Sequence, residues 1–288
     1  MTGATRTRFA PAPTGRLHLG HVANALWTWG FARAAGASVL LRIEDHDRQR
    51  SHATFDRAIL DDLDWLGFIA DAGPVRQSDP DAQAAYAAAS RKLADQALVY
   101  GCDCSRATFA RWHTTHGATW SGPGCPGGCR ERGVAGPVLR VALGAGVEGW
   151  IDELLGMRSG PVASGGDLPI RDRHGNWTYG FCVTVDDQRQ GVDLVVRGQD
   201  LLEATPVQIR LGRVLGRAVP ATFAHHPLIR RADGSKLSKS DGDTGIEALR
   251  AAGLTREAVL ARAADATGYR GERPSSGAGP DRSSISHA

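Results

Sequence analysis

The chain has 288 residues, a hydrophobic content of 42% and a formal net charge of +3. This length can bury a substantial core in one large or two modest domains, and so small a charge says little about an anionic partner. No run of about 18 apolar residues is present to span a bilayer, and the N-terminus lacks the apolar core of a signal peptide. We therefore expect a cytoplasmic protein with no membrane partner.

The N-terminal third alternates between strand and helix patterns. The expected elements are strands over 6–10 and 38–43, a helix that begins near residue 18, and helical patterns over about 53–66 and 82–98. A strand, a Gly-containing turn and a helix, in this order, are typical of the opening of a nucleotide-binding unit. The alternation favours a doubly wound, Rossmann-like parallel sheet that is covered by helices.

The pattern changes beyond this first region. Cys, Gly and Pro interrupt it over 102–129, and strand character returns over 138–143. The apolar runs 181–185 and 192–196 flank a polar segment, which predicts a hairpin or a pair of sheet strands, and a helix is expected over 203–215. The C-terminal end has almost no large apolar side chains, so a disordered tail is expected there.

These patterns predict a division of the chain into five parts. They are the first half of a Rossmann-like domain over 1–98, an insertion subdomain over 99–170, the second half of the domain over 171–245, a short helical segment over 246–269 and the tail over 270–288.

A lysine-containing pentapeptide predicts half of a phosphate site. The chain has 34 lysine and arginine residues, only three of them lysines, and two of these, Lys236 and Lys239, stand in Lys-Leu-Ser-Lys-Ser at 236–240. Lysine meets phosphate as a compact, flexible point charge, whereas arginine is a rigid fork, so retention of lysine indicates a specific requirement. The alternative is a chance cluster in a basic, Ser-rich turn.

The segment His18-Leu-Gly-His21 predicts the other half of this phosphate site. It follows the first expected strand and opens the first helix, at the sheet edge where open α/β sheets bind ligands. The imidazoles of His18 and His21 can donate hydrogen bonds to phosphate oxygens, and the helix N-terminus attracts an anion. Gly20 has no Cβ that would block a nucleobase.

The two segments resemble the HIGH and KMSKS signatures of class I aminoacyl-tRNA synthetases. The wider resemblance is to the glutamyl branch, through Arg8-Phe-Ala-Pro-Ala-Pro-Thr-Gly15, Arg42-Ile-Glu-Asp-His-Asp47, Thr178-Tyr179 ahead of Val185-Asp-Asp187, and Val196-Arg-Gly198. It covers about residues 6–245 and implies that ATP, with Mg²⁺, and L-glutamate condense to glutamyl-adenylate with release of pyrophosphate. By resemblance, ATP binds at His18, Gly20, His21 and Lys239, and the catalytic residues are His18, His21, Lys236 and Lys239.

A glutamate pocket is expected where several strands end. Glutamate has two carboxylates and one ammonium, so its pocket needs arginines for the acids and an acid for the amine. Arg8 and Arg197 suit the carboxylates, and Glu44 suits the ammonium. Taken alone, Glu44 or Arg197 is more typical of an ion pair or a solvated strand end, and it is their combination with the lysine segment that favours a pocket. The resemblance implies a pocket made of Arg8, Phe9, Ala10, Pro11, Ala12, Glu44, Tyr179 and Arg197.

Two positions depart from the glutamyl pattern. Ala12 stands where a serine is common, and Gly180 stands where a polar residue often follows the tyrosine. Each departure removes a possible hydrogen bond, worth about 0.5–1.5 kcal/mol net. Glutamate binding weaker than is usual in this branch is therefore expected.

Four of the five cysteines predict a metal site. They form two close pairs, Cys102-Asp-Cys104 and Cys125-Pro-Gly-Gly-Cys129. Four soft ligands in two knuckles match one structural, tetrahedral Zn²⁺ with no open position, as the insertion domain of the glutamyl family implies. The alternatives are free buried thiols, or a ligand from His113 or His116. Cys182, within an apolar run, is expected in the core.

The stretch after residue 240 bears on the expected RNA substrate. Only 48 of the 288 residues follow it, too few for the helical anticodon-binding domain of a discriminating glutamyl-tRNA synthetase. The chain therefore resembles the short paralogues, which esterify glutamate to queuosine at the wobble position of tRNA(Asp). Two alternatives stay open: a minimal synthetase that charges the 3′ end of tRNA, and a non-catalytic sensor of glutamate or ATP. A monomer is expected.

Overall fold

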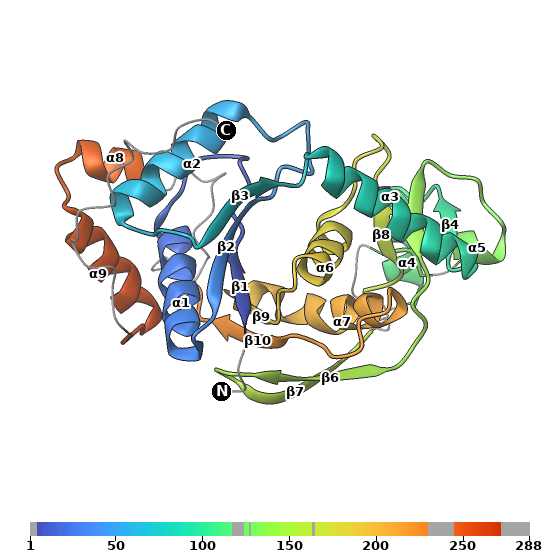
Figure 1. Cartoon of the computed structure of the whole chain (residues 1–288). Coiled ribbons are helices and arrows are strands. Elements are labelled where there is room, and N and C mark those ends of the chain that lie inside the picture. Colours follow the sequence, from blue (N-terminus) through green and yellow to red (C-terminus); the bar gives the residue numbers. More distant parts are fainter. Residues whose placement is uncertain (1–4, 117–123, 127, 163–164, 230–244, 272–288) are drawn as a thin grey trace.

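A computed structural model describes residues 5–116, 124–126, 128–162, 165–229 and 245–271 (Figure 1). The N-terminal sheet has the order β1-β2-β3, with all strands parallel. Its elements in chain order are β1 (Arg6–Phe9), α1 (Leu19–Ala35), β2 (Ser38–Ile43), α2 (Ala53–Leu66) and β3 (Ala72–Arg76). The strands and helices expected here from the sequence are confirmed. They could be predicted because their apolar residues follow regular periods.

A second sheet lies beside the first, with the order β7-β6-β10-β9. Its strands are β6 (Val147–Asp152), β7 (Gly156–Pro161), β9 (Leu194–Gly198) and β10 (Thr222–His226). β9 and β6 both run parallel to β10, and β7 runs antiparallel to β6. β1 and β9 adjoin, since the Asp193 amide donates to the Arg6 carbonyl at 3.1 Å.

The join between β1 and β9 is the point where the direction of strand succession reverses. From β1 the chain proceeds outward through β2 and β3, and it later returns to the other side of β1 with β9 and β10. Open α/β sheets bind ligands at such a switch point, beyond the carboxyl ends of the strands. The expected α/β fold with parallel strands is confirmed, and the switch point gives the place to look for a site.

A third, antiparallel sheet has the order β4-β5-β8. It comprises β4 (Val99–Cys102), β5 (Val138–Val141) and β8 (Leu168–Arg171), and the helices next to it in sequence are α3 (Pro80–Asp95), α4 (Arg106–His116) and α5 (Gly128–Glu131). In Figure 1 these elements lie at the opposite end of the molecule from α1 and α9. The hairpin β6–β7 falls within the range predicted for the insertion, yet it pairs with β10.

The apolar run 181–185 forms a helix, so the predicted strand is wrong. α6 (Tyr179–Arg189) contains this run, and residues 181–187 are all buried. A helix that is buried all round shows no polar face, and a short apolar run then resembles a buried strand. Cys182 is buried in this helix, so its expected place in the core is confirmed.

Four helical elements follow β9 in the described part of the chain, two of them before β10 and two after it. A 3-10 helix over Gln199–Ala204 leads into α7 (Thr205–Val214), and α8 (Ile246–Ala251) and α9 (Arg256–Thr267) form the helical C-terminal segment that was expected. α9 packs on α1, where Leu260 and Ala264 join the core of Phe9, Leu26 and Ile43. No helix among the described residues is long and apolar enough to cross a bilayer.

Candidate active site and cysteine cluster

A cavity of about 380 Å³ lies at the carboxyl ends of β1 and β9. It gathers residues from distant parts of the sequence, from Arg8 to Ile229. The predicted site residues that line it are Arg8, Ala10, His18, Gly20, His21, Glu44, Tyr179 and Arg197.

Three residues of the expected pocket do not line this cavity. The Phe9 side chain points into the core against Trp29, at 5.5 Å between ring centroids, because side chains alternate along β1 and Arg8 and Ala10 take the cavity side. The Pro11 carbonyl accepts the Glu44 amide at 2.9 Å, and Ala12 is half-buried.

Lys236 and Lys239 lie in segment 230–244, outside the described residues. The described residues on both sides of this segment are close to the cavity. Ile229 lines the cavity, and Gly245 forms a β-bridge with His18.

The two histidines of His18-Leu-Gly-His21 cap α1 reciprocally. The Gly20 amide donates to His18 Nδ1 at 3.0 Å, and the His18 amide donates to His21 Nδ1 at 3.1 Å. A ring nitrogen that accepts a backbone N–H must carry a lone pair, so each neutral ring holds its proton on Nε2. The rings lie 4.0 Å apart between centroids, which places two Nε2–H donors together at the positive end of the helix.

Gly20 is required by the histidine that precedes it. A Cβ at this position would lie 2.8 Å from Cε1 and 3.0 Å from Nδ1 of His18. The sequence predicted that Gly20 leaves room for a nucleotide, and the structure adds that it leaves room for the capping ring.

A buried ion network supports the polar end of the cavity. Arg8 Nε and Arg42 Nη1 both donate to Asp187 Oδ1, at 3.0 and 2.8 Å. Arg42 Nη2 also donates to Glu44 Oε1 at 3.1 Å. Burial raises the pKa of Asp187, but Arg8 and Arg42 outweigh this and hold it below the usual range. The network therefore holds the side chains of Arg8 and Glu44 in place at the cavity wall.

Tyr179 stands at the centre of these charges. Burial, with a further contribution from Glu44, raises the pKa of Tyr179 to about 12, so its hydroxyl remains protonated at neutral pH. Burial also raises the pKa of Glu44, while Arg42 and Arg8 oppose this rise. A neutral hydroxyl beside a carboxylate and two arginines can donate to one ligand group and accept from another.

Arg197 differs from Arg8 in that all of its hydrogen-bond partners among the described residues are neutral. Its guanidinium donates to His225 Nε2 at 3.0 Å, to Gln208 Oε1 at 2.6 Å, and to Thr205 Oγ1 at 2.7 Å. Burial, together with the positive charge of Arg8, lowers the pKa of Arg197, although Tyr179 and Asp187 oppose this shift. Within the described part of the chain, none of its hydrogen-bond partners is a carboxylate, so its charge is available to an acidic ligand.

The cavity also includes residues that the sequence did not single out. Asn24, Asp200 and His226 line it, and His226 Nε2 lies 3.3 Å from Asn24 Oδ1. Asn24 lies three residues after His21 on the same helix face, and Asp200 follows the end of β9, so both had a detectable signal in their spacing. Arg42 was visible as a charge within an apolar strand, which indicates a buried partner.

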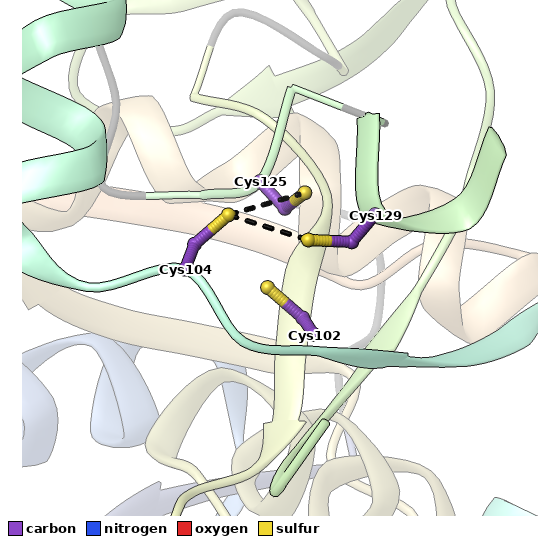
Figure 2. Close-up of side chains that lie close together, drawn as sticks. All are labelled: Cys102, Cys104, Cys125 and Cys129. Carbon is purple, nitrogen blue, oxygen red and sulfur yellow. Dashed lines mark hydrogen bonds between the residues drawn. The ribbon is translucent and has the colours of Figure 1, made fainter. Parts of the chain in front are cut away.

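The four cysteines of the predicted metal site converge between β4 and α5 (Figure 2). All four are buried and their Sγ atoms lie within 4.8 Å of one another. Cys104 Sγ is 3.4 Å from Cys129 Sγ and 3.9 Å from Cys125 Sγ, and none of the four forms a disulfide. Burial raises the pKa of Cys104 and of Cys129 above the usual range, so without a metal these thiols are protonated.

The geometry fits a single tetrahedral metal ion. Four sulfurs at about 2.3 Å from a central Zn²⁺ would be about 3.8 Å from one another, close to the separations seen here. Gly136 makes this convergence possible, since a Cβ there would lie 2.2 Å from the Cys102 backbone carbon. The structure therefore brings together all four predicted ligands; the side chains of His113 and His116 lie outside the described residues.

Comparison with protein families identifies the family of this chain. The chain matches the family of tRNA synthetases class I (E and Q), catalytic domain, over residues 4–119 and 160–270. The chain belongs to this family. Its resemblance to the glutamyl branch, which rested on HLGH, KLSKS and the motifs between them, is confirmed, and with it membership of the class I aminoacyl-tRNA synthetase type of ligase.

Two names recur among the curated proteins that resemble this chain. The glutamyl-Q tRNA(Asp) synthetase of Symbiobacterium thermophilum is 39% identical over 91% of this chain and 86% of its own length, and that of Rhodobacter capsulatus is 38% identical over 86% and 96%. The glutamate–tRNA ligase of a Synechococcus strain is 37% identical over 89% of this chain but 55% of its own length.

Solved structures agree with this assignment. A glutamate-tRNA synthetase from Elizabethkingia anophelis superposes with a TM-score of 0.69 at 27% identity, over 83% of this chain and 53% of that one. The chain thus spans about half the length of the glutamate–tRNA ligases it matches.

Proposed function

We propose that this protein activates L-glutamate with ATP and transfers it to the queuosine base at the wobble position of tRNA(Asp). The observation that carries the proposal is that one cavity brings a charged group of side chains together with the two capping histidines of α1. The side chains of this group are Arg8, Glu44, Tyr179 and Arg197. One end offers charges that complement an acidic amino acid, and the other offers donors for phosphate.

The glutamate is held by charge complementarity. Arg8 and Arg197 take its two carboxylates, and Glu44 takes its ammonium, with Tyr179 donating between them. Bidentate arginine contacts fix a carboxylate in both direction and distance. Because Arg8 and Glu44 are already paired within the buried network, they need little reorganisation when the ligand binds.

Activation joins this carboxylate to the nucleotide. An oxygen of the α-carboxylate attacks the α-phosphorus of ATP, the bond to the β-phosphate oxygen breaks, and pyrophosphate leaves with Mg²⁺. The Nε2–H groups of His18 and His21 donate to phosphate oxygens as charge builds up on them, and Lys236 and Lys239 neutralise the leaving group. The residues act by orientation and charge, so no side chain need accept a proton in this step.

Transfer to RNA completes the reaction. A hydroxyl of the queuosine cyclopentenediol attacks the activated carbonyl, the ester bond forms, AMP leaves and the hydroxyl proton goes to solvent. Supporting this acceptor are the glutamyl-Q tRNA(Asp) synthetases, which align with this chain over most of their own length. The second candidate is charging of the tRNA 3′ end, supported by the 37% identity to a glutamate–tRNA ligase.

The four cysteines would hold one Zn²⁺ as a structural ion, because four thiolates leave no coordination position open. When bound, the ion ties β4 to the segment of α5 and supplies no chemistry to the cavity. We propose that the protein acts as a monomer.

The amino-acid step is tested by glutamate-dependent exchange of pyrophosphate into ATP. Arg197→Ala is expected to abolish exchange while the dissociation constant for ATP changes little. Arg262→Ala, on the exposed side of α9, is the control and should exchange normally. Unchanged exchange in Arg197→Ala removes this residue from the pocket.

The acceptor is tested by mapping labelled glutamate on tRNA. Attachment to tRNA from which the 3′-terminal adenosine has been removed, together with its absence on tRNA lacking queuosine, supports the proposal. Labelling confined to the 3′ adenosine contradicts it and establishes the second candidate.

A further inference from the structure

We infer that Asp152 and His225 are positioning residues that orient Arg197 through a hydrogen-bonded relay, so that its charge stays available to the substrate carboxylate. This inference rests on the proposed function, in which Arg197 binds glutamate. It assigns a role to the hairpin β6–β7, whose β6 strand ends in Asp152 and pairs with β10.

The relay begins at a carboxylate that the backbone holds in place. Asp152 Oδ1 accepts the amides of Leu154 and Leu155, both at 3.1 Å, from the turn that follows β6. Asp152 Oδ2 lies 2.5 Å from His225 Nδ1, and both side chains have no exposed surface. Although burial raises the pKa of Asp152, the hydrogen bonds from His225 lower it overall, so this group is an anion and accepts.

The carboxylate selects one tautomer of His225. Because Asp152 accepts, the imidazole proton sits on Nδ1 and the lone pair sits on Nε2. Burial lowers the pKa of His225, which keeps the ring neutral. The lone pair then accepts from Arg197 Nε at 3.0 Å, the nitrogen that joins the guanidinium to the aliphatic part of the side chain.

The remaining contacts of Arg197 complete a neutral cage. Gln208 and Thr205 accept from the two terminal nitrogens, and the Phe223 ring lies 5.2 Å from the guanidinium carbon. A carboxylate in direct contact would orient Arg197 equally well but would also neutralise it. Because the imidazole stands between Asp152 and Arg197, the carboxylate orients the arginine without neutralising its charge, as a site for an anionic ligand requires.

Two substitutions of His225 separate the relay from simple packing. Glutamine places its carbonyl oxygen near the position of Nε2, so His225→Gln keeps an acceptor for Arg197 but leaves Asp152 without its partner. Asparagine places its amide near Nδ1, so His225→Asn keeps a donor for Asp152 but leaves Nε of Arg197 without an acceptor. If His225 positions Arg197, His225→Asn should impair glutamate binding more than His225→Gln does. If His225 only stabilises the fold, His225→Gln should be the more harmful of the two variants.

The measurement is pyrophosphate exchange with both KM values, alongside thermal unfolding of each variant. We expect His225→Asn to raise the KM for glutamate about tenfold or more, the cost of one hydrogen bond to a charged group, with the KM for ATP nearly unchanged. His225→Gln should keep a KM for glutamate within about threefold of the unaltered protein, yet it should unfold at the lower temperature of the two.

A third variant tests the tautomer. In Asp152→Asn the amide donates to Nδ1, so the ring must carry its proton on Nε2 and oppose Arg197. Its KM for glutamate should rise as in His225→Asn. If the KM for glutamate is the same in all three variants and in the unaltered protein, the relay is overturned, while the proposed function is not affected. Absence of glutamate-dependent exchange in the unaltered protein overturns the proposed function, and the relay with it.

Discussion

The guanidinium of Arg42 donates to the carboxylate of Glu44 at 3.1 Å, two residues along the same chain, and Arg42 has no exposed surface. Residues two apart on a strand share one face of the sheet, so the arginine lies directly behind the carboxylate at the cavity wall. The same guanidinium reaches Asp187 on α6, and it therefore joins the sheet to the helix that carries Tyr179.

Removal of Arg42 should be strongly destabilising. In Arg42→Met the carboxylates of Glu44 and Asp187 lose a buried partner, and a broken buried ion pair costs about 3–5 kcal/mol of the free energy of unfolding. Urea titration of the variant measures this loss. Arg48→Met, at an exposed position a few residues later, is the matched control and should change the value by less than about 0.5 kcal/mol.

A methyl group at Gly20 should impair nucleotide binding. The Cβ of Gly20→Ala would lie 2.8 Å from the His18 ring, so the ring must move away from its capping position. We expect the KM for ATP in pyrophosphate exchange to rise about tenfold, the value of one displaced hydrogen bond to a phosphate.

The control for this glycine is Gly212, in α7. A Cβ there meets no described atom nearer than 3.6 Å, so Gly212→Ala should leave exchange unchanged and raise the free energy of unfolding slightly, as alanine does in helices. A normal KM for ATP in Gly20→Ala would show that the two rings do not act on the nucleotide.

Metal content should depend on the clustered cysteines and not on Cys182. Cys104→Ser is expected to lose most of the zinc that the unaltered protein retains after purification without chelators, since serine is a poor ligand for this ion. Cys182→Ala, within α6, should retain one zinc per chain. Elemental analysis of both variants decides the matter, and equal zinc content in the two would rule out the cluster as the site.

Stability should depend on pH through Asp62. Burial raises the pKa of Asp62 to about 6, and its Oδ2 has no hydrogen-bond partner. Between about pH 4 and 6 the folded protein keeps this proton while the unfolded chain has lost it, so the free energy of unfolding falls as pH rises and stays low above pH 6. The shift of about 2 units corresponds to roughly 3 kcal/mol.

Asp62→Asn removes this proton and its pH dependence. The stability of the variant relative to the unaltered protein should therefore increase by up to about 3 kcal/mol from pH 4 to pH 7, as measured by urea unfolding at each pH. Asp95→Asn, at an exposed position at the end of α3, is the control and should show no such trend. A constant difference across this range would contradict the assigned titration.

The sequence predicted the parts of the fold in which hydrophobic periodicity is regular. β1, α1, β2 and α2 have such periods, and they place His18 and Glu44 at the correct sheet edge. In most strands the apolar side chains are buried and the charged ones are exposed. In β6, Glu148 and Asp152 are buried while Val147 and Ile151 are exposed, so the alternation of the sequence predicts the wrong face as the buried one. The relay on Arg197 depends on that inversion and on β10, and neither could be predicted from a local pattern.

The neutral cage of Arg197 has a consequence for the choice between glutamate and glutamine. The charges of Arg8 and Arg42 are paired with Glu44 and Asp187, and Asp186 is paired with Arg189. Arg197 has no carboxylate in hydrogen-bond contact among the described residues, because Asp152 lies behind the His225 imidazole. Glutamate brings a carboxylate for each of Arg8 and Arg197, whereas glutamine brings only one, so discrimination between two amino acids of equal size becomes a matter of direct charge pairing.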